Sequence, residues 1–244
     1  ETDSSDVYYV RIDKNRKLPV TTLLRALGLS TDEQIKQFFG DSEPKINASL
    51  EKDITHNTEE GLLEVYRKLR PGEPPTVENS RAHLNNLFFD PRRYDLARFG
   101  RYKMNNKLSL TRRIAGYKAA EDIIALTGEL LAAKGEKINM AKAEEIDNAG
   151  VTRVTILVEK KGEEPRPFIV ISNGCVNAQN FFSFDVEAEA GVNERANFAE
   201  IRKILDTTSD VEEQKELLRQ NHDVLISRTV TVDDIFASVN YLLG

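Results

Sequence analysis

The stretch KLRPGEPPTVENSRAHLNNLFFDPRRYDLARFGRYKMNNKL, residues 68–108, brings arginines, prolines and paired phenylalanines together in a chain whose net charge is −6. Pro71, Pro74 and Pro75 cannot continue the helix that precedes them, and Thr76 is a residue type that caps the next one. A proline-shaped backbone lowers the entropy lost in positioning an arginine, whose planar guanidinium suits phosphate oxygens and guanine edges. The stretch therefore suits a surface that holds a polyanion in a fixed register.

Length and composition fit an ordinary globular protein. The 244 residues suffice for one large domain or two small ones, with 40% hydrophobic and 30% charged residues. No run of about 18 apolar residues occurs, so no membrane span is expected. The chain opens ETDSSDVYYV, with neither a signal peptide nor an initial Met, which indicates a piece of a longer polypeptide. The single Cys175 fits a reducing compartment and is expected to be a small buried hydrophobic residue.

Charge is distributed unevenly along the chain. Residues 1–118 contain 21 Lys and Arg against 17 Asp and Glu, a net charge of +4. Residues 119–244 contain 13 against 23, a net charge of −10. This asymmetry indicates two modules with different neighbours, of which only the basic one is suited to face nucleic acid.

The hydrophobic pattern predicts an α+β fold in which helices predominate. In the basic half we expect a strand at 7–12 and helices from Pro19 to Gly28, from a Ser30–Glu33 capping box to Gly40, over 57–69, and from Thr76 to about 88. Residues 41–56 and the cationic segment up to Leu108 are expected to be irregular. In the acidic half we expect two short strands around Thr127-Gly128, a helix at 139–150, a hairpin at 151–172, and helices at 193–206, 210–221 and 231–243.

Motifs for catalysis or metal binding are missing from the sequence. It contains no P-loop, no G-x-G-x-x-G and no Cys/His metal spacing, and His56, His83 and His222 are isolated from one another. Adjacent carboxylates fit solvated faces or helix N-termini. We therefore expect no independent enzymatic activity, no catalytic residues, and no metal or other cofactor in this chain.

Basic side chains are the candidate binding groups instead. They lie near the ends of predicted strands and helices, and the candidates are Arg11, Lys14, Arg16, Lys17, Arg70, Arg93 and Arg101. Two interpretations stay open at this point: the cations contact a polyanion, or they neutralise carboxylates within the fold, namely Asp13, Glu73, Asp90 and Asp95. The low aromatic content, 7% without Trp, argues against a single-strand binder built on stacking platforms.

Several motifs carry a family resemblance. VRIDKNRKLPVTTLLRALG (10–28), RPGEPPT (70–76), FFDPRRYDL (88–96), GRYKMN (100–105) and the terminal TVDDIFASVNYLLG (231–244) together resemble the lobe (beta-2) domain of the bacterial RNA polymerase beta subunit. The resemblance covers nearly all of residues 7–112 in order. TGELLAAKGEKINMAKAEEIDNAGVTRVTI (127–156) resembles the small barrel-sandwich hybrid module of the large polymerase subunits.

The resemblance implies a division of the chain. Residues 1–112 with 229–244 would form the helix-rich lobe platform. Residues 113–228 would form an acidic, lineage-dependent insertion that contains a small β module, at about 119–172, and further helices. Phe88 and Phe89 would belong to the core of the platform.

The resemblance also implies a role in transcription. The lobe walls the downstream DNA channel of a multisubunit nucleotidyltransferase and lies close to the non-template strand, whereas the catalytic Mg²⁺ is held by the beta-prime subunit. Expected partners are DNA, the rest of beta, and the beta-prime, alpha and sigma subunits, without a membrane. The expected location is the bacterial cytoplasm at the nucleoid, and the isolated chain is expected to be monomeric. The alternative is a protein-interaction module that binds sigma or another factor through residues 113–228.

Five positions are implied as the DNA-facing ones. Arg70 and Arg93 would lie beside the non-template strand, with Asp13, Lys14 and Arg16 nearby. The family often has three consecutive basic residues before KLP. This sequence has Lys14-Asn15-Arg16, so the middle charge is absent.

Overall fold

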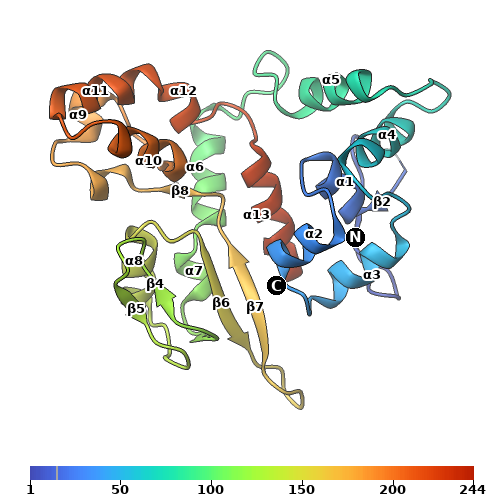
Figure 1. Ribbon diagram of the computed structural model, residues 1–244, viewed down its shortest axis with the longest axis horizontal. Coiled ribbons are helices and arrows are strands. Elements are labelled where there is room, and N and C mark those ends of the chain that lie inside the picture. Colours follow the sequence, from blue (N-terminus) through green and yellow to red (C-terminus); the bar gives the residue numbers. More distant parts are fainter. Residues whose placement is uncertain (15) are drawn as a thin grey trace. The chain divides into compact units, whose positions relative to one another are not determined.

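The computed structural model describes residues 1–14 and 16–244 (Figure 1). Contacts between Cα atoms divide the chain into two compact units. Unit 1 comprises Glu1–Tyr94 and Leu243, and unit 2 comprises Asp95–Leu242 and Gly244. Helices dominate and the strands form small antiparallel sheets, which confirms the α+β class. No sheet of the described residues closes into a barrel.

Unit 1 is a group of helices beside a two-stranded sheet. Its elements are β1 (Tyr9–Val10), β2 (Leu18–Pro19), α1 (Val20–Ala26), α2 (Asp32–Phe39), α3 (Pro44–Lys52), α4 (Thr58–Leu69) and α5 (Val77–Phe88). Helix α4 packs on both α1 and α5. A Cβ at position 61 would lie 2.9 Å from the backbone nitrogen of Ala26, so Gly61 permits the close approach of α4 to α1.

Buried polar contacts fix the centre of unit 1. The Arg25 guanidinium is 1% exposed and lies 3.2 Å from the Asp53 carboxylate, while a second carboxylate, that of Asp32, also pairs with it. The Thr22 hydroxyl donates to Asp53 at 3.0 Å. Since a buried charge is costly unless it is paired and hydrogen-bonded, these contacts tie α1, α2 and the end of α3 into one arrangement.

Two expectations for unit 1 are wrong. Residues 41–56 are not all loop, because α3 occupies Pro44–Lys52 with proline at its start. Its apolar stripe consists mainly of Ile46 and Leu50, too short a pattern to reveal a helix. The capping box lies one residue later than expected: Thr31 and Gln34 form it.

Unit 2 combines small sheets with helices. Its first elements are α6 (Ala97–Leu108), α7 (Thr111–Ile114), β3 (Lys118–Ala119), β4 (Ile123–Ile124), β5 (Leu130–Ala132), α8 (Met140–Asn148), β6 (Arg153–Val158) and β7 (Arg166–Ile171). Strands β3, β6 and β7 form one antiparallel sheet, and β4 pairs with β5. The expected short strands, the helix at 139–150 and the hairpin at 151–172 are therefore confirmed.

The remaining part of unit 2 consists mostly of helices, several of which gather at the upper left of Figure 1. Its elements are β8 (Cys175–Val176), the 3-10 helix η1 (Ala178–Phe181), α9 (Val186–Ala190), β9 (Ala196–Asn197), α10 (Phe198–Thr207), α11 (Val211–Gln220), α12 (His222–Leu225) and α13 (Val232–Leu243). Phe182, Phe184, Phe198 and Ile201 belong to the apolar core beneath α9–α12. Thr231 caps α13 with Asp234, as its position before the last helix predicted.

Cys175 lies inside unit 2. Its side chain is buried, and this burial is the main reason that the pKa of the thiol is raised to about 12. A thiol held in its neutral form is neither a nucleophile nor a metal ligand, so the expectation of a small buried hydrophobic residue is confirmed. Across the described chain, 1–14 and 16–244, every helix is too short or too polar to cross a membrane.

The two units do not share the boundaries of the division that the resemblance implies. Unit 2 begins at Asp95 and includes most of α13, whereas the implied platform joins residues 1–112 to 229–244. The implied division concerns which segments the lobe has acquired as an insertion, and it stays a prediction.

Limited proteolysis distinguishes these two boundaries. The unit boundary lies in the exposed segment 91–95, which contains Arg92 and Arg93. We expect trypsin to cut there first and to release fragments that end and begin near residue 93, since exposed loop tips are preferred cleavage sites. First cuts at 109–120 or 222–230 would contradict the unit boundary and favour the implied division. Mass spectrometry of the early fragments gives the answer.

Candidate nucleic-acid interface

The first group of predicted cations lies between β1 and β2. The strands pair Tyr9 with Pro19 and Val10 with Leu18, and Ile12 anchors the start of the connection in the core. Of the described residues that follow in the connection, Asp13, Lys14, Arg16 and Lys17 are exposed.

Asp13 and Lys14 adopt the left-handed backbone conformation, with φ of 52° and 61°, which is uncommon outside glycine. Their side chains and that of Arg16 are exposed. Asn15, where the family's middle charge is absent, lies outside the described residues. The tight connection therefore presents two of the predicted cations and one carboxylate to solvent.

Arg11 and Lys17 are partly neutralised within unit 1. Arg11 Nε lies 3.1 Å from a Glu1 carboxylate oxygen, and Lys17 Nζ lies 3.5 Å from the other. The hydrogen bond from Arg11 is the first cause that lowers the pKa of the Glu1 carboxyl. Lys17 also lies 4.3 Å above the centre of the Tyr9 ring. These contacts are exposed and weak, so they reduce the availability of both cations without removing it.

The second group forms where α4 turns into α5. Arg70 terminates α4, and its backbone N–H donates to the Tyr66 carbonyl at 2.8 Å. The Tyr66 ring meets the His83 ring of α5 edge to face, with centres 5.6 Å apart. The Tyr66 hydroxyl donates to Glu73 at 2.8 Å. The proline turn thus closes over an aromatic contact that fixes α4 against α5.

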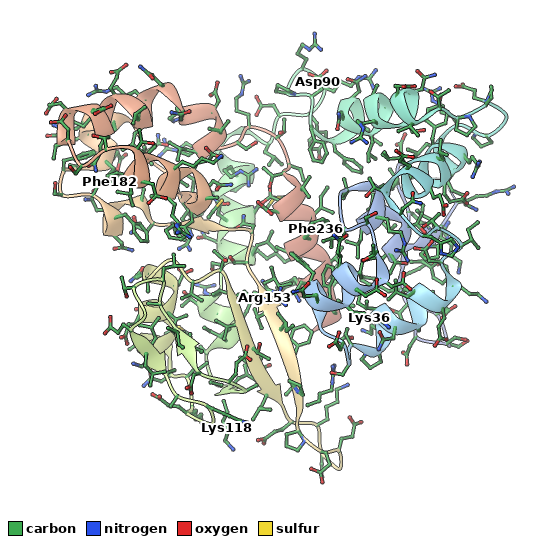
Figure 2. All side chains as sticks on the ribbon, viewed as in Figure 1. Lys36, Asp90, Lys118, Arg153, Phe182 and Phe236 are labelled. Atoms are coloured by element: carbon green, nitrogen blue, oxygen red, sulfur yellow. The ribbon has the colours of Figure 1, made fainter. Side chains whose placement is uncertain are left out.

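Arg93 lies on the turn that follows α5. Its backbone N–H donates to the carbonyl of Asp90, which is labelled in Figure 2, at 3.0 Å. The Asp90 side chain binds the neighbouring Arg92 at 3.0 Å. The hydrogen bond from the Arg92 side chain is the main reason that the pKa of Asp90 is lowered. Arg92 is 87% exposed but paired, whereas Arg93 has no carboxylate of its own on this turn.

The carboxylates expected to neutralise Arg70 and Arg93 are engaged elsewhere. Glu73 accepts from Tyr66, and Asp95 pairs with Arg228. Within residues 1–14 and 16–244, no ion pair or side-chain hydrogen bond involves the Arg70 or Arg93 guanidinium. Of the two interpretations left open by the sequence, internal pairing therefore does not apply to these two residues.

The positive charges of Arg70 and Arg93 both lower the pKa of His83. Burial is the largest cause of this shift. The positive charges of Arg70 and then Arg93 lower the pKa of His83 further, whereas the negative charge of Glu73 raises it. The imidazole is half-buried and is held in its neutral form. The positive charges of the two exposed guanidinium groups thus act on the same side chain of α5.

Arg101 requires a correction. It was grouped with the candidate cations, yet it is 3% exposed and lies 2.9 Å from the Asp234 carboxylate inside unit 2. Its Nε donates to the Ser227 carbonyl at 3.0 Å, and Asn173 donates to both Asn105 and Asp234 at 2.9 Å. Arg101 is a core residue, and we remove it from the candidate interface.

The expectation of irregular structure up to Leu108 is wrong for the same reason. Helix α6 buries Arg101, Asn105 and Leu108 along one face. Two of these three are polar, so a search for apolar residues at helical spacing does not find the helix. Phe88 and Phe89, expected in the core, are half-buried and pack on each other with ring centres 5.9 Å apart.

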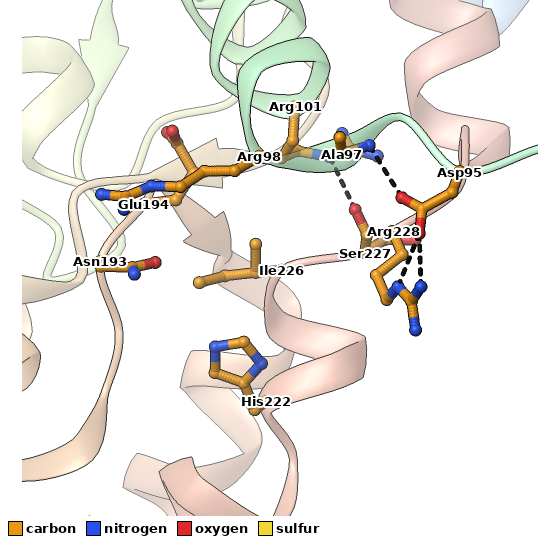
Figure 3. Close-up of a pocket in the computed structure, with 10 residues that line it drawn as sticks. All are labelled: Asp95, Ala97, Arg98, Arg101, Asn193, Glu194, His222, Ile226, Ser227 and Arg228. Atoms are coloured by element: carbon orange, nitrogen blue, oxygen red, sulfur yellow. Dashed lines mark hydrogen bonds and ion pairs between the residues drawn. The ribbon is translucent and has the colours of Figure 1, made fainter. Parts of the chain in front are cut away.

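A pocket opens at the start of α6 (Figure 3). It has a volume of about 290 Å³ and is lined by Asp95, Ala97, Arg98, Arg101, Asn193, Glu194, His222, Ile226, Ser227 and Arg228. Its Arg228 and Arg101 are paired with neighbouring groups, and its charges have both signs. No group of three or more His, Cys, Asp or Glu among the described residues is placed to hold a metal. The pocket offers neither a nucleophile with a base nor a cation cluster.

Comparison with known proteins shows the family to which the chain belongs. The family model for RNA polymerase Rpb2, domain 2, matches residues 1–155. The DNA-directed RNA polymerase subunit beta of Clostridium perfringens is 47% identical, that of Clostridium beijerinckii 48%, and that of Clostridium novyi 45%. Each alignment runs over 245 residues and covers 100% of this chain but 19% of the relative.

The chain therefore belongs to the RNA polymerase Rpb2, domain 2 family, and the resemblance to the bacterial beta-subunit lobe is confirmed. It spans 19% of the length of the curated relatives that it matches. Because the alignments run the whole length of the chain, these relatives carry a counterpart of residues 113–228.

The buried ion pair of unit 2 gives a stability prediction. Replacing Arg101 with Met should lower the free energy of unfolding by about 3–5 kcal/mol, because Asp234 is left charged without its partner. Urea denaturation followed by circular dichroism measures the change. Arg98→Ala, three residues earlier on α6 and exposed, should change it by no more than about 0.5 kcal/mol. Equal stability of the two variants would contradict the assignment of Arg101 to the core.

Proposed function

We propose that this chain is the DNA-facing lobe of a bacterial RNA polymerase beta subunit, and that Arg70 and Arg93 contact the DNA backbone at the wall of the downstream channel. Lys14 and Arg16 add positive charge nearby, with Asp13 shaping the connection that carries them. Arg11 and Lys17 contribute once DNA competes with Glu1. The family membership supports the setting, and the exposed cations of unit 1 support the contact.

The observation that supports this proposal most strongly is that the guanidinium groups of Arg70 and Arg93 are exposed and have no carboxylate partner among the described residues. Two exposed arginines of this chain are paired, Arg92 with Asp90 and Arg228 with Asp95. Arg70 and Arg93 remain unpaired beside carboxylates that bind other groups, within the part of the chain that the structure describes. Bidentate, charge-assisted hydrogen bonds to phosphate oxygens would give both guanidinium groups a partner.

The lobe performs no chemistry in this proposal. It works within a DNA-directed RNA polymerase, a nucleotidyltransferase whose Mg²⁺ is held by the beta-prime subunit. Its partners are the downstream duplex and the non-template strand, together with the rest of beta and the beta-prime, alpha and sigma subunits. It acts in the cytoplasm at the nucleoid.

A second function is favoured by an apolar surface on unit 2. Ile124 and Leu130 face each other across β4 and β5 and are 55% and 54% exposed, with Leu126 59% exposed on the intervening turn. Neighbouring exposed apolar residues mark interaction surfaces. Residues 113–228 would then bind sigma or another protein factor. Salt-insensitive binding of a factor that Leu130→Ser abolishes would support this function, and salt-sensitive binding would oppose it.

Single substitutions in the assembled polymerase test the DNA contact. Arg70→Ala and Arg93→Ala should each weaken the promoter-open complex and lower the slope of log affinity against log salt by roughly one unit, since each removes one phosphate contact. Arg92→Ala, adjacent in sequence but paired with Asp90, is the matched control and should leave the slope unchanged.

Thermal unfolding of the same variants separates contact from stability. Exposed substitutions should change the free energy of unfolding by no more than about 0.5 kcal/mol. If Arg70→Ala and Arg93→Ala lower thermal stability while the salt slope and open-complex lifetime stay at wild-type values, the proposed DNA contact is wrong.

A further inference from the structure

His83 shares a place on unit 1 with the two unpaired arginines. It belongs to α5, and its ring rests against Tyr66 of α4, the residue whose carbonyl accepts from the Arg70 N–H and whose hydroxyl binds Glu73 on the α4–α5 turn. The charges of Arg70 and of Arg93, on the turn after α5, both lower its pKa. The ring is half-buried, so part of it faces solvent. No hydrogen bond involving the imidazole nitrogens forms within residues 1–14 and 16–244.

We propose that His83 is a third phosphate-binding side chain of this site, and that it takes up one proton from solvent when a DNA phosphodiester binds between Arg70 and Arg93. This inference rests on the proposed function and adds to it a binding residue and a dependence on pH. A neutral imidazole has one N–H donor and one acceptor nitrogen, whereas the protonated ring has two donors. The bound phosphate supplies the acceptor for the added N–H.

The charges around His83 give the direction of the effect. In the free protein, burial and the two arginines hold the pKa of His83 below 6.5, with Glu73 as the opposing charge. A phosphodiester brings one negative charge, which offsets the arginines and favours the imidazolium ion. Tyr66, the ring in contact with His83, already donates its hydroxyl proton to Glu73 and stays neutral near pH 7. Phosphate binding therefore raises the pKa of His83.

The same linkage determines how DNA affinity changes with pH. The protonated ring contributes fully to binding below the pKa of the free protein. The contribution is lost as pH rises through the higher pKa of the complex. Each unit by which DNA raises the pKa corresponds to about a tenfold change in affinity across this window.

The experiment measures DNA affinity of the assembled polymerase from pH 5.5 to 8.5 at fixed salt, with four forms of the beta subunit. We expect the affinity of the wild type to fall with rising pH relative to His83→Gln, whose side chain does not titrate. His83→Lys, permanently charged over this range, should keep high affinity and lose the pH dependence. His56→Gln, which changes an exposed histidine of the same unit, is the matched control and should follow the wild type.

Each outcome has a separate meaning. If wild type, His83→Gln and His83→Lys show the same pH profile, His83 does not take up the proton and the inference is wrong. If that happens while Arg70→Ala and Arg93→Ala still weaken binding, the proposed DNA contact survives. If the arginine variants bind DNA as the wild type does, the proposed function fails.

Discussion

Pairing between guanidinium and carboxylate groups decides which arginines of this chain are structural and which are free. Arg25 is enclosed by Asp53 and Asp32 in unit 1, and Arg101 is enclosed by Asp234 in unit 2. The Arg25–Asp53 and Arg101–Asp234 pairs are buried, where a lone charge is strongly unfavourable, so the helices that carry them are held in one arrangement. Arg70 and Arg93 lie outside these networks. Among the described residues, Arg70 and Arg93 therefore keep guanidinium groups at the surface that can still bind an anion.

Much of the fold could be predicted from the sequence because local signals agree with packing. Thr76 and Asn139 cap the helices that follow them, and the alternating pattern of 151–172 forms the expected hairpin. Prediction failed where polar residues occupy interior positions. Helix α6 faces the core with Arg101 and Asn105, and the partner of Arg101 lies 133 residues away in sequence. A charge that is neutralised by so distant a residue leaves no local signal.

The candidate site was predicted in part. The family resemblance pointed to Arg93 and not to Arg92, but composition alone did not separate Arg93 from Arg92 or from Arg101. That distinction depends on Asp90 and Asp234, whose side-chain directions are set by tertiary structure. His83 was missed because an isolated histidine on a helix has no motif, and only tertiary packing brings its ring against Tyr66, where the charges of both arginines lower its pKa. The pattern of residues thus indicated the kind of surface, and packing selected its members.

A DNA strand with one uncharged phosphate analogue tests most directly whether Arg93 binds a DNA phosphate. A non-template strand with one methylphosphonate, moved stepwise along the downstream edge of the bubble, removes one charge at a time from the DNA. At one position we predict that the substitution weakens binding to wild-type polymerase but has little further effect on Arg93→Ala, because each change removes the same contact. Additive losses for the substitution and Arg93→Ala at every position would show that Arg93 does not bind a phosphate of this strand.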